Sequence, residues 1–335
     1  MKKDFPHILQ TPWWGLAKQK AQPGWTAFFF IKKMGKDAFL LTSPEPFKIE
    51  DLECACLVLE RNLKFDLRLH YIPRGPWLDW SSTEQIKSCF EFLKDFASKR
   101  KAFFIRLEPD VYEGEIDEDL LQILGFKRTP SYIQAKDTVK VELNKTEEDL
   151  LSSFHPKHRY NIKLAQKRGL KVRCSNDVED VKGFYELLVK TEIRHGGALR
   201  IHPLRYYQKI FEVLAPQNLS RLYLVEKDNK LVSASMVFTY GNEAIYMYGA
   251  SDYEARRDMP NHLREWVSML DARKEGRRYF DLWGVTMRND PDGGIKRYKL
   301  GYCENVLNMA GTFDWAAKPF KYFAFKIMER MRRGI

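Results

Sequence analysis

The stretch PNHLREWVSMLDARKEGRRYFDLWGVTMRNDPDGGIKRYKLGY, residues 260–302, carries the clearest structural signal in the chain. Its pattern predicts a helix over Pro260–Lys274, a buried strand over Arg278–Trp283 and a short helix over Ile295–Leu300. A polar loop, residues 288–294, separates the last two elements. Helices and strands alternating at this spacing are typical of an α/β domain.

The same order of elements occurs earlier in the chain. Apolar residues spaced three and four apart predict a helix over Thr83–Arg100, followed by a buried strand over Phe103–Leu107 and a short helix over Asp119–Leu124. Both stretches close on a Leu-Gly-aromatic triplet, at residues 124–126 and 300–302. We therefore expect one α/β module present twice, with chance similarity as the alternative because helix–strand alternation is common.

The junction between the modules is expected near residues 142–157, where the sequence has a polar helix start. Thr146 and Asp149 match a capping box in which Asp replaces Glu or Gln, and this pattern marks the start of a helix. The sequence thus divides into a first domain, residues 1–143, and a second, residues 144–316, with a final helix over residues 317–335. Further strands are predicted at Ala27–Lys32, Phe39–Leu41, Cys54–Leu59 and Leu67–Tyr71.

Composition excludes a disordered chain and places the charge unevenly. Of 335 residues, 44% are hydrophobic and 14% aromatic, enough to bury a core. Residues 1–150 hold 23 Lys and Arg against 24 Asp and Glu, whereas residues 151–335 hold 33 against 21. The basic excess of the second half predicts a polyanionic partner, either nucleic acid or an anionic membrane surface.

Two segments carry much of this basic excess. No acidic residue occurs in residues 151–176, and Arg159, Lys163 and Lys167 share one face if the segment is helical. Like charges at this spacing repel, which favours a phosphate-bearing ligand over a merely solvated face. From Lys318 onward, basic residues alternate with aromatic ones. That helix either lies in a membrane interface or docks by its aromatic face with its charges in water.

Other signals narrow the compartment and the chemistry. We expect a cytosolic protein, because the start of the chain lacks the apolar run of a signal peptide and no stretch is long enough to span a bilayer. The five cysteines are expected to be buried thiols, with no metal site. Nucleophile, phosphate-loop and zinc-protease motifs are absent. Residues 255–261 lead into a helix without a glycine, which argues against an acyl-CoA pyrophosphate site.

Six stretches together resemble the Fem family (FemABX type) of peptidyltransferases. They are ILQTPWWGLAKQKAQPGW at 8–25, YIPRGPWLDW at 71–80, HPKHRYNIKLAQKRGLKV at 155–172, LVSASMVFTYGNEAIYMYGASDYEARRDMPNHLREW at 231–266, YFDLWGV at 279–285 and KRYKLGY at 296–302. The resemblance implies two tandem acetyltransferase-like (GNAT-like) domains, with the final helix returning to the first. It also implies transfer of an amino acid from aminoacyl-tRNA to a side-chain amine of the peptidoglycan precursor's stem peptide, with no cofactor.

The resemblance assigns substrate-binding roles residue by residue. Lys18 matches a lysine that binds the precursor's phosphates, and Tyr206 and Tyr248 match tyrosines of the same site. His202 stands where the family carries an arginine, so Arg205 or Arg200 is the candidate substitute. A surface lysine and ordinary core aromatics are the alternatives for these positions.

Two further residues are candidates for the chemistry. Glu108 stands where relatives can carry Asp near the acceptor peptide, and it is a candidate to hold or deprotonate the incoming ammonium. Lys299 matches the lysine that meets the aminoacyl end of tRNA, where a cation stabilises the developing oxyanion. The alternatives are a salt-bridged acid and a solvated helix lysine.

We therefore expect a cytosolic, membrane-peripheral aminoacyltransferase that uses tRNA, bound through Arg159, Lys163 and Lys167, and a lipid-linked or nucleotide-linked precursor. Two other functions remain open from the sequence: an acyl-CoA N-acyltransferase acting on another amine, and a non-catalytic RNA-binding protein. The transferred amino acid and the accepting amine are not specified by the sequence.

Overall fold

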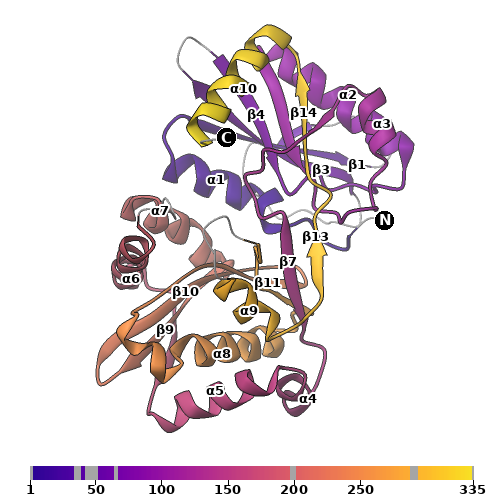
Figure 1. Cartoon of the computed structure of the whole chain (residues 1–335). Coiled ribbons are helices and arrows are strands. Elements are labelled where there is room, and N and C mark those ends of the chain that lie inside the picture. The colour runs from indigo at the N-terminus through magenta and orange to yellow at the C-terminus, as the bar shows by residue number, and fades with distance from the viewer. Residues whose placement is uncertain are drawn as a thin grey trace. The chain divides into compact units, whose positions relative to one another are not determined.

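A computed structural model describes residues 3–33, 39–41, 52–63, 67–196, 201–286 and 293–333. The chain forms two compact units, residues 1–134 with 309–335 and residues 135–308, and each is built on a seven-stranded sheet (Figure 1). The sequence placed the junction after residue 143, nine residues beyond the boundary that packing defines, and assigned residues 309–316 to the second domain.

The first unit has the strand order β2-β1-β3-β4-β5-β14-β6. Its helices start at polar caps: Thr11 accepts a hydrogen bond from the Trp14 amide at the start of α1, and Ser82 caps α2 in the same way. The elements are α1 (Pro12–Ala21), β1 (Trp25–Lys33), β2 (Phe39–Leu41), β3 (Leu52–Leu63), β4 (Leu67–Pro73), α2 (Thr83–Lys99), β5 (Ala102–Glu108), α3 (Glu118–Ile123), β6 (Lys127–Thr129), β14 (Thr312–Ala316) and α10 (Pro319–Arg333).

Strand β5 is buried on both faces although it contains two charged residues. Side chains alternate across a strand, and Ile105 and Leu107 lie in the apolar core with α2. Phe104, Arg106 and Glu108 lie on the opposite face, where α10 packs against Phe104 and Arg106. Both buried charges therefore need partners on that face.

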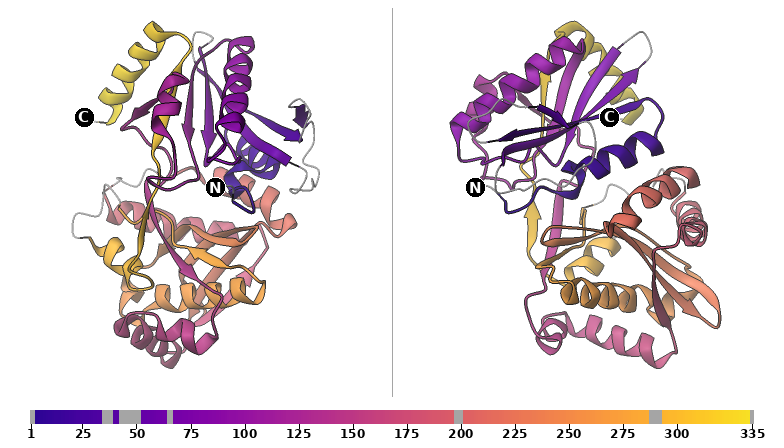
Figure 2. Two further views of the ribbon diagram at one scale, coloured as in Figure 1. Left: turned by 90° about the vertical axis from the view of Figure 1, so that its right-hand side faces the viewer. Right: turned by 180° about the vertical axis from the view of Figure 1, so that it is seen from behind.

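The second unit has the strand order β13-β7-β12-β11-β10-β9-β8. Helices α5 and α8 cover one face of this sheet and α6 and α7 the other (Figure 2). Thr146 accepts a hydrogen bond from the Asp149 amide, which confirms the predicted cap at the start of α4. The elements are β7 (Asp137–Glu142), α4 (Glu147–Ser152), α5 (Pro156–Lys167), β8 (Lys171–Ser175), α6 (Asp180–Arg194), α7 (Leu204–Leu214), β9 (Ser220–Lys227), β10 (Lys230–Tyr240), β11 (Glu243–Ser251), α8 (Pro260–Lys274), β12 (Tyr279–Asp281), α9 (Gly294–Leu300) and β13 (Val306–Asn308).

The two sheets follow one plan with an exchange of strands. Helix α2 joins the parallel strands β4 and β5, and α8 joins the parallel strands β11 and β12. Strand β7 follows β6 in the sequence but pairs between β12 and β13 of the second unit, and β14 follows β13 but pairs between β5 and β6 of the first. The repeated module is thus confirmed in topology, and the exchange of β7 and β14 explains why the expected boundaries differ from the observed ones.

Two remaining expectations are partly tested by the described residues. Within them, no helix combines the length and the apolar character required to cross a bilayer. Cys54, Cys56 and Cys89 are buried free thiols and Cys303 is half-buried, whereas Cys174 is exposed, so the prediction of burial was wrong for Cys174. The loop at residues 288–294 lies mostly outside the described residues.

Candidate active site

The parallel strands at the centre of the second unit part from each other soon after they meet. Glu243, Ala244 and Ile245 of β11 pair with Tyr279, Phe280 and Asp281 of β12. Over the remainder of β11, from Tyr246 to Ser251, the register gives no described residue a β12 partner. The sequence predicted a strand as far as Trp283, but β12 ends at Asp281. The sheet is therefore open at a position where continued pairing was expected.

Two acidic side chains hold the backbone of the diverging segment, and one residue of that segment has a strained conformation. Trp283 has φ +59°, in the left-handed region that non-glycine residues rarely adopt. Asp281 Oδ1 accepts a hydrogen bond from the Trp283 amide at 2.6 Å, and Asp137 Oδ1 accepts one from each of the Val285 and Thr286 amides at 3.0 Å. Carboxylates thus accept the backbone donors of the diverging segment, three N–H groups in all.

Lys299 contacts both sides of the opening. Its side chain extends from α9 and is buried, and its Nζ donates a hydrogen bond to the Gly284 carbonyl at 2.6 Å. The same Nζ lies 5.7 Å from the ring centroid of Tyr246, the first residue of β11 beyond the paired segment. A buried cation therefore sits where the two strands separate.

Tyr246 is positioned by a second buried cation that the sequence did not single out. Arg264 donates hydrogen bonds to Tyr246 Oη at 3.1 Å and to the Ala234 and Ala250 carbonyls, and it pairs with Glu265. Burial raises the pKa of Tyr246 to about 12, so its hydroxyl stays protonated. In the sequence, the charged pair Arg264-Glu265 is typical of a solvated helix surface. Only its apolar neighbours Leu263 and Trp266, which are buried, indicate that this part of the helix is in the core.

Three of the predicted substrate-binding residues come together elsewhere in the second unit. Tyr206 Oη lies 3.3 Å from Tyr248 Oη, and the His202 ring lies against that of Tyr206, tilted by 31°, with centroids 3.9 Å apart. Burial raises the pKa of Tyr206 to about 12 and also raises that of Tyr248 well above its usual value, so both remain neutral hydroxyls. Arg205 is exposed on α7, and Arg200 lies outside the described residues.

Lys18 belongs to the first unit, where it is half-buried on α1. Its Nζ lies 5.8 Å from the Trp14 ring centroid. Burial, with the nearby charge of Arg61, lowers the pKa of Lys18 to about 8. A bound anion beside Lys18 and Arg61 would raise the pKa of the lysine again and restore its full charge. This is the effect expected of a bound phosphate.

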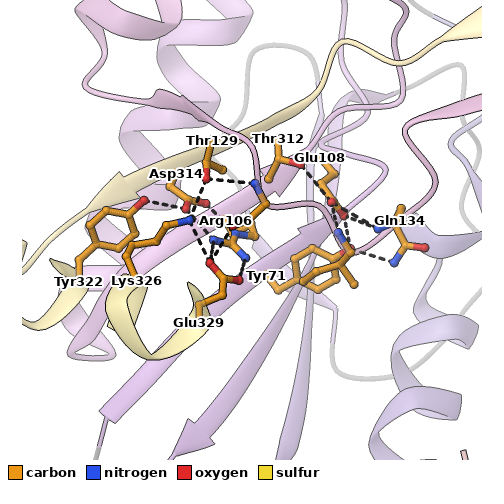
Figure 3. Close-up of polar contacts among 12 residues, drawn as sticks. Tyr71, Arg106, Glu108, Thr129, Gln134, Thr312, Asp314, Tyr322, Lys326 and Glu329 are labelled. Atoms are coloured by element: carbon orange, nitrogen blue, oxygen red, sulfur yellow. Dashed lines mark hydrogen bonds and ion pairs between the residues drawn. The ribbon is translucent and has the colours of Figure 1, made fainter. Parts of the chain in front are cut away.

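Glu108 is also in the first unit, and its carboxylate is buried among hydrogen-bond donors (Figure 3). Oε1 accepts from the Ile133 amide at 2.5 Å and from Thr312 Oγ1 at 3.1 Å. Oε2 accepts from Tyr71 Oη and from the Gln134 amide at 3.1 Å. Four donors occupy the acceptor sites of the carboxylate, an arrangement suited to fixing the segment that leads toward β7.

Comparison with known proteins shows which family the chain resembles. A profile described as "Acetyltransferase (GNAT) domain" matches residues 152–300, and one described as "FemAB family" matches residues 47–129. "Lipid II:glycine glycyltransferase" of Staphylococcus epidermidis is 26% identical, over 83% of this chain and 84% of that protein. The same enzyme of Staphylococcus aureus is 27% identical, over 78% and 80%.

The solved structure titled "Crystal structure of FemX" has a TM-score of 0.82 at 23% identity and covers 95% of this chain and 94% of its own. These matches make the Fem family the one that this chain resembles. Its fold is two GNAT-like units, as the sequence predicted.

The two profiles cover some of the candidate site residues and not others. Lys299, Tyr248, His202 and the opening between β11 and β12 fall within the acetyltransferase match, and Glu108 falls within the FemAB match. Lys18 lies outside both.

The start of α8 departs from an acyl-CoA site. The carboxylate of Asp258 lies just before the helix and pairs with Arg168 and Lys227. Pro260 occupies the first turn and supplies no N–H. A pyrophosphate would meet a negative charge and one donor fewer at this helix N-terminus. No group of side chains suited to hold a metal ion occurs within the described ranges.

The basic helix α5 divides the predicted tRNA-binding residues. Arg159 donates to the carbonyls of Ser152 and Phe154 at 2.9 and 2.7 Å, so it caps the end of α4. Lys163 and Lys167 are exposed and share a face with Tyr160, an exposed aromatic residue that the charge pattern does not single out. Because Arg159 is engaged with these carbonyls, the like-charge repulsion expected among the three cations is reduced to that between Lys163 and Lys167.

Proposed function

We propose that this chain is a non-ribosomal aminoacyltransferase that moves an amino acid from aminoacyl-tRNA to the side-chain amine of a peptidoglycan precursor's stem peptide, in building the interpeptide bridge. The relatives named lipid II:glycine glycyltransferase support transfer of an amino acid to such a precursor. The observation that carries the proposal is the buried ammonium of Lys299 at the opening between β11 and β12.

The reaction needs positioning and charge stabilisation more than an activated enzyme nucleophile. The neutral acceptor amine attacks the carbonyl carbon of the aminoacyl ester, an amide bond forms, and the ester C–O bond breaks. The proton lost by the amine ends on the 3′-oxygen of the departing tRNA ribose. Lys299 stabilises the negative charge that develops on the carbonyl oxygen, and Tyr246 lines the wall beside it.

Other residues bind the two anionic substrates in this proposal. Lys18 contacts the precursor's phosphates, and His202, Tyr206 and Tyr248 form an aromatic wall beside the exposed guanidinium of Arg205. Glu108 positions the segment that it binds, because its acceptor sites are occupied by internal donors.

The tRNA is bound on α5 in the same proposal. Lys163 and Lys167 contact its phosphates, and Tyr160 offers a surface on which an unpaired base can stack. Arg159 contributes through the end of α4 that it caps. The enzyme acts at the cytoplasmic face of the plasma membrane.

A reconstituted transfer assay tests the proposal. Purified protein is incubated with a panel of charged tRNAs and a lipid-linked or nucleotide-linked muropeptide, and mass spectrometry should detect a precursor heavier by one residue. Lys299→Met should lower kcat by about 10²- to 10³-fold, the usual loss when one oxyanion-stabilising group is removed. Lys296→Met, an exposed lysine on the same helix, is the matched control and should retain activity.

The assay also separates the competing functions. Transfer from an acyl-CoA, with thermal protection by CoA and none by charged tRNA, would replace the proposal by an acyl-CoA N-acyltransferase. Tight tRNA binding without transfer from any charged tRNA would leave a binding protein.

A further inference from the structure

Helix α10 is fixed to the first unit by a face that carries its polar contacts together with the rings of Tyr322 and Phe325 (Figure 3). Glu329 pairs with the buried Arg106 at 2.7 Å, and Tyr322 Oη donates to Asp314 at 2.8 Å. Lys326 donates to Thr129 Oγ1 and is within 2.9 Å of Glu329. Burial opposes ionisation of Glu329, but the Arg106 guanidinium lowers the pKa of its carboxyl to about 2, so the pair is charged at neutral pH.

The face pointing away from the unit is apolar. Phe320, Phe323, Ile327 and Met331 recur at intervals of three and four residues, which places them on one stripe of the helix. Phe320 is 93% exposed, Phe323 68% and Met331 76%. The sequence left open whether α10 docks by its aromatic face. Phe325 and Tyr322 do pack on β5, but this larger apolar set faces outward.

Cations border the stripe on both sides. Lys321 and Arg330 are exposed and lie at its two edges by helical spacing, and Lys318 is exposed just before the helix. Glu329 is the acidic residue of α10, and its carboxylate is turned inward to Arg106. Through Met331, where side chains are described, the outer face of α10 therefore offers apolar and positive groups.

This arrangement reverses the usual orientation of a helix on a soluble domain, which buries its apolar stripe. An apolar stripe with basic borders matches the helices that lie in the interface of a bilayer, where rings and methyl groups enter the acyl boundary and cations meet anionic headgroups. A protein partner would have to supply a complementary acidic groove, whereas an anionic bilayer supplies both features over any area.

We propose that the outer face of α10 docks on an anionic lipid surface, and, given the proposed function, that the acceptor is the lipid-linked rather than the nucleotide-linked precursor. Docking brings the enzyme to the surface in which a lipid-linked substrate resides. The proposal commits to a bilayer as the occupant of this face.

Vesicle flotation with the full chain tests the docking. Vesicles of phosphatidylcholine with about 30% phosphatidylglycerol should bind the protein, and raising the salt should weaken binding. Phe320→Ser with Phe323→Ser should lower the partition coefficient by about tenfold or more. Ile123→Ser with Ile193→Ser removes two exposed apolar residues from α3 and α6 and should leave binding unchanged.

Two further measurements keep the outcomes distinct. Lys321→Gln with Arg330→Gln should abolish the preference for anionic over neutral vesicles. Sedimentation tests whether α10 instead pairs with a second copy: a dimer that the Phe320→Ser/Phe323→Ser variant converts to a monomer, with vesicle binding unaffected, would overturn the proposal.

Transfer assays separate this inference from the proposed function. If the function holds, the Phe320→Ser/Phe323→Ser variant should lose transfer to vesicle-embedded precursor and keep it toward the same precursor in detergent. Efficient transfer to a nucleotide-linked precursor with none to the vesicle-embedded form would overturn the choice of acceptor. Stripe-dependent vesicle binding by a protein with no transfer activity would sink the function and leave the docking intact.

Discussion

The parallel strand pairs at the centres of the two units differ in how far they stay together. In the first unit β4 and β5 remain paired from Arg68 and Ala102 to Pro73 and Glu108. In the second, β11 and β12 share a register over three residues and then diverge. Two copies of one topology therefore hold one closed pair and one open pair, and the buried lysine lies at the open pair.

The acidic residues beside these pairs have opposite effects on the sheet. Glu108 gathers Tyr71, Thr312 and two backbone amides at the end of the closed pair. Asp137 and Asp281 accept the amides of a segment that has left its neighbouring strand. Internal hydrogen bonding thus accompanies a closed strand pair in one copy of the module and an open pair in the other, and the proposed chemistry lies at the open pair.

The largest expected effect is at the closed pair. Glu108→Ala leaves four buried donors without their acceptor and should lower the free energy of unfolding by about 3 kcal/mol or more. Glu108→Gln keeps one carbonyl acceptor and should lose less. Urea unfolding measures the change, and hydrogen exchange should localise it to the first unit. Unchanged stability in both variants together with abolished transfer would assign Glu108 to the chemistry and break the comparison.

At the open pair, Asp137→Ala removes the acceptor of the Val285 and Thr286 amides. We expect a loss of about 1–3 kcal/mol of unfolding free energy. Transfer should fall further, since Gly284, which accepts the Lys299 hydrogen bond, is the residue next to Val285. Asp137→Asn, which retains the side-chain carbonyl oxygen, is the control. An open segment that keeps full activity after Asp137→Ala would show that this carboxylate does not hold it.

The same carboxylate gives a pH dependence. Burial would raise the pKa of Asp137, but hydrogen bonds from Thr286 and Val285 hold it below its usual value. Because the folded pKa is the lower one, the stabilisation is complete above the unfolded value of about 3.9 and is lost as the pH falls through the folded pKa. Denaturation from pH 5 downward should therefore show a steeper loss for the wild type than for Asp137→Asn.

The smallest expected effect concerns the surface of the second unit. Lys163→Gln with Lys167→Gln should reduce the slope of log affinity for tRNA against log salt by about 1.5 to 2, with stability and vesicle binding unchanged. Lys87→Gln with Lys182→Gln removes the same charge from α2 and α6 and is the control. Equal slopes for the two double variants, measured by filter binding, would remove α5 from the tRNA site.

The sequence predicted what local pattern determines. The spacing of apolar residues predicted α2 and α8, and the two Leu-Gly-aromatic triplets indicated that the α/β module occurs twice. The exchange of β7 and β14 was missed, because strand pairing between residues more than 130 positions apart leaves no local pattern in the sequence. Arg264 was missed because a charged pair on a helix has the same pattern whether it is solvated or buried.

At the candidate site, the resemblance named Lys299, Tyr206 and Tyr248, and the geometry adds their neighbours. The opening that gives Lys299 its setting depends on the backbone of Trp283, a residue whose type predicts an extended strand. The orientation of α10 depends on the ion pairs of Arg106 with Asp314 and Glu329. These residues lie far apart in the sequence, and the periodicity of a sequence cannot show that they pair.

The exchange of strands also sets an order on synthesis. A ribosome synthesises the chain from its N-terminus, and β5 and β6 of the first unit are joined in the sheet through β14, which follows the whole second unit in the sequence. The second unit has all of its strands once residue 308 has emerged. The half of the protein that is made first is therefore the half that is finished last, and β6 waits without its partner while the whole second unit is translated.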